Sequence, residues 1–195
     1  MTSPNSNGTD GLAAARQVAV PNPLRNKLIK GQLAHALSIK LVSSIEVVGY
    51  AAAAKYDSIL IDLEHSPFGL ETTNQLSCAA LALGYVEFYQ TRLVNSLIIS
   101  LTPIVRVPAN TSDWISRALD GGAQAIIVPH VNSAKEAQDV VRYAKFAPIG
   151  ERSATGTMPM LRYAPVPAKY ANPVCNELTT VICMIETVRA LDDVG

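Results

Sequence analysis

The sequence predicts an α/β fold in which parallel strands and outer helices form a (β/α) barrel. Strand-like and helix-like segments alternate from Gly31 onward, and the strand-like segments are nearly continuous apolar runs. Such runs are typical of parallel strands that are covered on both faces. Polar residues follow these strands directly, at the positions where a barrel carries its chemistry. This clustering favours a barrel over a doubly wound sheet, and the chain has no Gly-x-Gly-x-x-Gly or P-loop motif for nucleotide binding.

The first two β/α units are predicted from apolar spacing. Strands are expected at residues 32–39 and 58–63, and helices at residues 43–55 and 69–83. The first helix has Ile45, Val48 and Ala52 at helical spacing on one face, and the second has Leu76 and Leu83 facing inward. Each helix can therefore cover the sheet with an apolar face.

The later units depend more on start and stop signals. Strands are expected at residues 102–107, 123–128 and 179–185, and helices at 112–119, from Ser133 onward and at 186–194. Gly121 and Gly122 are a plausible helix stop. Ser133 with Glu136 three residues later forms a capping box at a helix start. Between these units, residues 146–167 are expected to form a long loop rich in Gly, Pro and Arg.

Composition narrows the class of protein. The 195 residues suit one ordinary domain, expected at residues 25–195 after a disordered tail at residues 1–24. Lys plus Arg and Asp plus Glu both number 16, which leaves no basic footprint for nucleic acid or for an anionic membrane surface. No apolar run approaches the roughly 20 residues of a membrane-spanning helix. The three cysteines lack metal-site spacing, so we expect reduced thiols and a cytoplasmic location.

The most informative segment is the end of the second strand, where Asp62, Glu64 and His65 follow an apolar run. A carboxylate that accepts from one imidazole nitrogen leaves the other nitrogen free to take a proton, so Asp62 with His65 resembles an oriented base. The alternative is a capped strand end with solvated polar groups. Three polar groups at one strand end favour the functional reading. Glu64 is expected to face elsewhere, because side chains alternate along a strand.

Arg106 and Glu186 are the other two strong candidates. Arg106 lies within a buried strand, where a guanidinium needs an anionic partner. That partner is either a structural carboxylate such as Asp120 or a substrate carboxylate or keto acid. Glu186 ends the fifth strand, where it either binds a hard cation such as Mg²⁺ or Mn²⁺ or interacts with a helix dipole.

Weaker signals lie near these residues. Asp120 precedes Gly121-Gly122 and is either a helix-end residue, a partner of Arg106 or part of the site. His130 follows the fourth strand and is expected to be a solvated rim residue. The loop residues Gly150, Arg152 and Ser153 are candidates to lie over the site.

Together these segments resemble the HpcH/HpaI aldolase family of metal-dependent 2-oxo-acid aldolases related to citrate lyase. The matching segments occur in the family's order at residues 60–65, 102–108, 118–124, 127–131, 147–152 and 184–187. The resemblance implies a (β/α)₈ barrel of the TIM type that cleaves 4-hydroxy-2-oxo acids to pyruvate and an aldehyde. It also implies a small 2-oxo-acid substrate, a divalent metal (Mg²⁺ or Mn²⁺, with Co²⁺ also suitable) and a homo-oligomer.

The resemblance assigns roles to individual residues. Glu186 is implied as one of two carboxylate metal ligands, and Arg106 as the group that binds and polarises the pyruvoyl unit. His65, oriented by Asp62, is implied to handle the proton, and Asp120 to support the site. A related enzyme that decarboxylates or cyclises an oxaloacetate-like enolate would use the same residues.

Two departures from the family pattern qualify these expectations. Family members run directly from a segment like 82–84 into one like 101–103, so residues 85–100 are an atypical insert. The codons of Gly84, Tyr85 and Val86 can be written GGG-TAT-GTN, which contains the intron donor GTATGT, and the Ser100 codon can supply the terminal AG. We therefore hypothesise a retained short intron. A mature transcript that encodes all of these residues would contradict it.

The second departure concerns the end of the chain. Residues 192–195 fall early in the fifth helix, so only about five of eight β/α units are expected, and the family's second metal carboxylate is not among them. We expect such a chain to fold poorly or to need a partner, and to lack normal aldolase activity. The alternative reading is a non-catalytic remnant that acts only through protein binding.

Overall fold

The computed structural model describes residues 6–90 and 101–193. Its centre is a parallel five-stranded sheet with the strand order β1-β2-β3-β4-β5. The strands are β1 (Ala36–Ile39), β2 (Ser58–Asp62), β3 (Thr102–Arg106), β4 (Ala125–Val128) and β5 (Thr180–Cys183). Asp62 is level with Arg106, and Arg106 with Ile127, so the carboxyl ends of the central strands lie together.

This strand order distinguishes between the two predicted topologies. Each strand pairs with the one that precedes it along the chain, without the reversal of order that defines a doubly wound sheet. Sequential parallel pairing is the order found in a (β/α) barrel. The predicted α/β class with barrel-type strand order is therefore confirmed.

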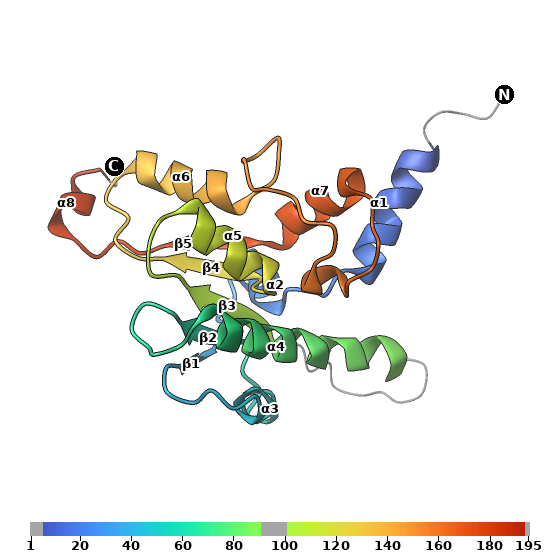
Figure 1. Ribbon diagram of the computed structural model, residues 1–195, viewed down its shortest axis with the longest axis horizontal. Coiled ribbons are helices and arrows are strands. Elements are labelled where there is room, and N and C mark those ends of the chain that lie inside the picture. The colour runs from blue at the N-terminus through green and yellow to red at the C-terminus, as the bar shows by residue number, and fades with distance from the viewer. Residues whose placement is uncertain (1–5, 91–100, 194–195) are drawn as a thin grey trace.

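A helix follows each strand of the sheet (Figure 1). These helices are α3 (Glu46–Ala53), α4 (Leu70–Gln90), α5 (Ser112–Asp120), α6 (Ala134–Ala144) and α8 (Val188–Leu191). The predicted start of α6 is confirmed, since the backbone N–H of Glu136 donates to the Ser133 hydroxyl at 3.1 Å. The Glu136 carboxylate accepts from the backbone N–H of Asn132 at 2.7 Å, one residue earlier than in a standard capping box.

The two faces of the sheet bury different residues, as strand alternation requires. Ile59, Ile61 and Ile126 are fully buried in the main core beneath the outer helices. On the opposite face Ile104 packs with Leu24 in a smaller cluster. Burial of each large apolar side chain stabilises the fold by about 1.5–3 kcal/mol, and the larger cluster therefore contributes most.

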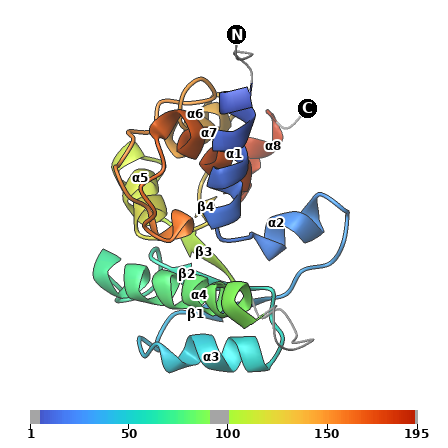
Figure 2. The same cartoon turned by 90° about the vertical axis from the view of Figure 1, so that its right-hand side faces the viewer.

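The amino-terminal segment is helical, which corrects the expectation of a disordered tail. Helix α1 (Ser6–Val18) packs against helix α7 (Ala168–Leu178), and α2 (Pro23–Leu28) lies beside the amino ends of the strands (Figure 2). Ala15, Ala19 and Val20 are buried, so the polar composition of this segment hid a small apolar face. The expectation is wrong for residues 6–24; residues 1–5 lie outside the described residues.

The segment between β4 and β5 contains more structure than the predicted loop. It includes a 3₁₀ turn, η1 (Pro159–Leu161), before helix α7 (Ala168–Leu178). Met160 and Leu161 are buried in a second core cluster together with side chains of α1 and α7. This cluster explains why α7 forms although Pro173 lies inside it, because packing outweighs local propensity.

The atypical insert begins as helix. Helix α4 was expected to end at residue 83 but continues to Gln90. The rest of the insert, residues 91–100, lies outside the described residues, and the intron hypothesis stays a prediction. In residues 6–90 and 101–193, no helix has both the length and the apolarity needed to cross a membrane.

Candidate active site at the carboxyl ends of the strands

A continuous series of contacts between charged side chains crosses the carboxyl ends of all five strands. We name these six residues the rim chain: Lys40, Asp62, Glu64, Arg106, His130 and Glu186. Each strand is followed by, or ends in, at least one of them. Basic and acidic side chains alternate along the series, so each carboxylate lies next to at least one basic group.

Asp62 is the most strongly held member of the rim chain. The Arg106 guanidinium donates to both of its carboxylate oxygens, at 2.9 Å from Nε and 2.5 Å from Nη2. Lys40 Nζ lies 3.1 Å from Oδ2. Burial by itself raises the pKa of Asp62, but the hydrogen bonds from Arg106, the His65 backbone and Lys40 outweigh it and hold that pKa well below its usual range. Asp62 is therefore a permanent anion that orients Arg106.

Glu64 joins the two halves of the rim chain. Its Oε2 lies 3.2 Å from Arg106 Nη1, and its Oε1 lies 3.0 Å from His130 Nε2. The backbone N–H groups of Glu64 and His65 both donate to Asp62 Oδ1, which turns the chain immediately after β2. This turn ends the strand alternation and brings Glu64 into the site, so the expectation that it faces elsewhere is wrong.

His130 connects Glu64 to Glu186. Its backbone N–H donates to Glu186 Oε2 at 3.0 Å, and its ring Nδ1 lies 3.4 Å from the same oxygen. His130 has a φ of 55°, a left-handed conformation that is uncommon outside glycine. The ring is 62% exposed, as predicted for a rim residue, but it is paired with two carboxylates.

His65 lies at the rim without the predicted contact to Asp62. Its backbone N–H, at 3.1 Å, is the group that donates to Asp62. The imidazole is 62% exposed, and its Nε2 lies 3.6 Å from Glu64 Oε2. The oxygens of Asp62 are taken by Arg106, Lys40 and two backbone N–H groups, so the nearest carboxylate to the ring is Glu64.

Asp120 lies away from the rim chain. It ends α5, just before β4 begins, whereas Arg106 and Glu186 follow the carboxyl ends of their strands. Its Oδ1 accepts from Arg152 Nη2 at 2.6 Å, so the predicted alternative of an Asp120–Arg106 pair is wrong.

The loop of Arg152 lies at the same end of the sheet as Asp120. Arg152 stacks on Phe146 at 4.5 Å, and its backbone N–H donates to Lys145 O at the end of α6. A Cβ at Gly150 would lie 2.4 Å from Lys145 O, so a glycine is required where this loop folds back on α6. Residues 150–153 are therefore not positioned over the rim chain.

The oxygen ligands that the rim chain offers are of the kind that Mg²⁺ or Mn²⁺ prefers. Glu186 has a partly exposed carboxylate, and Glu64 Oε2 is buried without a hydrogen bond although Arg106 lies nearby. Within the described ranges, no three His, Cys, Asp or Glu side chains form a metal-binding group. Among the members of the rim chain, Glu186 is therefore suited to bind a metal ion, but the described residues do not supply a complete set of metal ligands.

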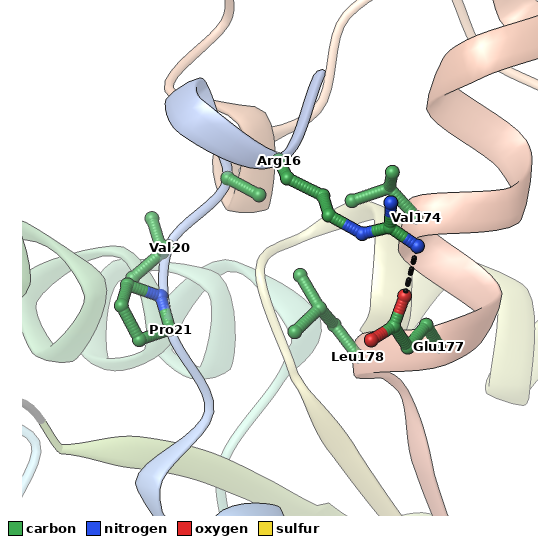
Figure 3. A pocket seen from close by; sticks show the side chains of 7 residues that line it. Arg16, Val20, Pro21, Val174, Glu177 and Leu178 are labelled. Carbon is green, nitrogen blue, oxygen red and sulfur yellow. Dashed lines mark hydrogen bonds and ion pairs between the residues drawn. The ribbon is translucent and has the colours of Figure 1, made fainter. Parts of the chain in front are cut away.

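Two cavities lie elsewhere on the molecule. One of about 170 Å³ lies between α1, α7 and the segment that follows α1 (Figure 3). It is mostly apolar, and its polar groups are an exposed Arg16–Glu177 ion pair at 3.0 Å. The other, of about 290 Å³, lies between α3 and α4 and has Glu46 as its one charged lining residue. Neither brings together titratable groups suited to catalysis.

The position of a polar residue just after a strand identifies more members of the rim chain than the sequence analysis names. Lys40 directly follows β1 as Glu186 follows β5, but a lone lysine after a strand is an ordinary surface feature. The same rule of position selects His130. Position relative to the strand end identified His130 as a rim residue and could also have identified Lys40, whereas the partners of both residues could not be predicted from spacing.

Comparison with known proteins agrees with this geometry. The family model for HpcH/HpaI aldolase/citrate lyase matches residues 41–195. The chain is 37% identical over 177 residues to a 4-hydroxy-4-methyl-2-oxoglutarate aldolase of Hapsidospora irregularis, covering 90% of this chain and 60% of that protein. It is 33% identical over 175 residues to the enzyme of the same name from Chaetomium globosum, covering 89% and 59%.

A solved structure gives the same result. The HpcH/HpaI aldolase of Desulfitobacterium hafniense superposes with a TM-score of 0.73 at 27% identity, covering 87% of this chain and 59% of that one. The chain thus spans about 60% of the length of the curated relatives it matches. The family match covers most of the sequence and includes every member of the rim chain except Lys40. The chain therefore belongs to the HpcH/HpaI aldolase/citrate lyase family.

Proposed function

We propose that the rim chain is the site of a carbon–carbon lyase that cleaves 4-hydroxy-2-oxo acids to pyruvate and a second carbonyl compound. The observation that carries this proposal is Arg106, a nearly buried guanidinium held between Asp62 and Glu64 at the mouth of the sheet. The names of the two fungal relatives support it, since both are aldolases of a 4-hydroxy-2-oxo acid.

Arg106 is suited to bind the pyruvoyl half of the substrate. Its Nε and Nη2 donate to Asp62, and Nη1 faces Glu64, which fixes the plane of the guanidinium. A guanidinium carries five N–H donors, so at least two remain for a ligand. A planar fork with fixed orientation matches a carboxylate or a 2-oxo carboxylate without further ordering of the side chain.

Cleavage requires one proton to leave and one to return. As the C3–C4 bond breaks, the C4 hydroxyl loses its proton and becomes a carbonyl, and the bonding electrons form the pyruvate enolate. The enolate then takes a proton at C3 to give pyruvate. His65 is the group we assign to the proton at the C4 hydroxyl, because its imidazole is exposed at the rim and lies beside the Glu64 carboxylate.

Negative charge develops on the enolate oxygen and must be stabilised. A bound Mg²⁺, Mn²⁺ or Co²⁺, with Glu186 as one ligand, would supply this stabilisation as a Lewis acid. Arg106 adds a fixed positive charge on the same side of the site, which strengthens as water is excluded. The residues of this chain thus bind and orient the 2-oxo acid and move the proton.

Pyruvate release from 4-hydroxy-4-methyl-2-oxoglutarate, followed with lactate dehydrogenase and NADH, tests the proposal. The sequence alone predicts that a chain with about five β/α units lacks normal aldolase activity, but these units assemble the whole rim chain, so we expect measurable turnover with Mg²⁺ or Mn²⁺. That turnover should be lost after metal chelation, and kcat/KM should fall by about 10²–10³ for Arg106→Met. Arg142→Met on the surface of α6 is the matched control, and its kcat/KM should stay within about threefold of wild type. A wild-type chain that is folded and loaded with metal but releases no pyruvate would contradict the proposal and favour a non-catalytic binding role.

A further inference from the structure

Lys40 is a cation of the rim chain that the proposed mechanism leaves without a role. It directly follows β1, and its ammonium lies 3.1 Å from Asp62 Oδ2 at the mouth of the site. The same oxygen accepts from Arg106 Nη2. Two cations therefore lie side by side, separated by a single carboxylate oxygen.

Asp62 does not need Lys40 to be satisfied. Its two oxygens accept from Arg106 in a bidentate pair and from two backbone N–H groups. The Lys40 side chain is 48% exposed, and an ion pair with so exposed a lysine contributes little stability. One of the three ammonium N–H groups is engaged by Asp62 among the described residues, so two remain available to a ligand.

We propose that Lys40 is the residue that binds the second carboxylate of a short dicarboxylic 4-hydroxy-2-oxo acid, the kind of substrate named for the two fungal relatives, and that it thereby sets the preference for such a substrate. This inference rests on the proposed function, because Arg106 holds the pyruvoyl half and leaves Lys40 to the half that departs as the second carbonyl compound. The two cations share one oxygen of Asp62, so the two anionic groups that they bind must be close together. A short chain between the carboxylates satisfies this condition, whereas an uncharged or long apolar tail leaves Lys40 unused.

Binding of a matched pair of unreactive ligands tests this inference separately from catalysis. 2-Oxoglutarate and 2-oxovalerate have the same number of carbons and differ in the second carboxylate, and neither has a 4-hydroxyl group to cleave. Calorimetric titration of the full chain with each ligand, in the presence of Mg²⁺, gives the ratio of the two Kd values. We expect wild type to bind 2-oxoglutarate at least tenfold more tightly than 2-oxovalerate.

Variants at Lys40 identify the source of this preference. Lys40→Met should reduce the ratio to within about twofold of one, and Lys40→Arg should restore most of it, because arginine keeps the charge. Lys30→Met, an exposed lysine before β1, is the matched control and should keep the wild-type ratio. Thermal unfolding of each variant reports any loss of structure.

Four outcomes would overturn the role of Lys40, and the first three concern the ratio of the two affinities. They are an equal affinity of wild type for both ligands, a preference that survives in Lys40→Met, and an equal loss of both affinities in that variant, which would show that Lys40 only supports Asp62. Failure of wild type to bind either ligand would also overturn it. The chain could also show a dicarboxylate preference that depends on Lys40 and yet release no pyruvate. That result would support the role of Lys40 and contradict the proposed reaction.

Discussion

Replacement of Asn22 by alanine tests whether the amino-terminal segment closes the amino end of the sheet. Asn22 is fully buried between α1 and α2. Its Oδ1 accepts from the backbone N–H of Arg25 at 2.9 Å and from the Thr102 hydroxyl at 3.0 Å. Its Nδ2 donates to Leu178 O at 2.8 Å and more weakly to Gln124 O at 3.3 Å. One amide thus connects the start of α2 with the starts of β3 and β4 and the end of α7.

The structure gives the magnitude of the expected loss. Removal of a helix N-cap costs about 1 kcal/mol. The alanine variant also leaves Leu178 O and the Thr102 hydroxyl buried without this partner, and each unsatisfied group costs about 1–3 kcal/mol, reduced where a second partner or water remains. We expect the free energy of unfolding to fall by about 3 kcal/mol, which lowers Tm by about 6–12 °C for a chain of this size.

Urea and thermal unfolding followed by circular dichroism measure this loss. Asn26→Ala is the matched control, because Asn26 is exposed on the same short helix, and its free energy of unfolding should change by less than about 0.5 kcal/mol. If Asn22→Ala and Asn26→Ala unfold alike, residues 19–28 do not pack on the sheet and the original expectation of a disordered tail would be correct.

Three further predictions follow from single side chains. Because the pKa of Asp62 is depressed in the folded protein, the contribution of the Asp62 carboxylate to stability is present above about pH 4 and is lost as pH falls. Asp62→Asn should therefore flatten the dependence of the unfolding free energy on pH between about 5 and 3. Burial raises the pKa of Cys175 to about 11, so peptide mapping after native alkylation at pH 8 should find it far less modified than the partly exposed Cys78. Asp120→Asn leaves the Arg152 guanidinium, 1% exposed, without its carboxylate and should lower the urea unfolding free energy by about 2 kcal/mol; no change would contradict the pairing.

The sheet could be predicted because its signal is local. Runs such as residues 59–61 and 125–128 are apolar, and the helices between them carry apolar faces at helical spacing. Helices α1 and α7 escaped prediction because their stability comes from packing on each other, which neither sequence alone displays. The apolar face of α1 consists mainly of alanines, and Pro173 in α7 is a residue that local rules assign to a break.

The sequence alone predicts which strand ends carry the polar groups of the site. Asp62, Arg106 and Glu186 were selected on that basis, and they lie at one rim. The partners could not be predicted, because they depend on the turn after β2 and on the register of neighbouring strands. Asp120 was selected by its proximity to a glycine pair and by resemblance, but it lies where its helix returns toward the start of β4.

If the rim chain generates a pyruvate enolate, the methyl protons of pyruvate must exchange with solvent when the enolate is reprotonated. The full chain is mixed with pyruvate and Mg²⁺ in D₂O, and the methyl signal is followed by proton NMR. We expect the signal to be lost at least about a hundredfold faster than without protein, and we expect chelation of the metal and Arg106→Met to suppress this loss. A methyl signal that decays no faster with the folded chain than in buffer would contradict enolate formation by the rim chain.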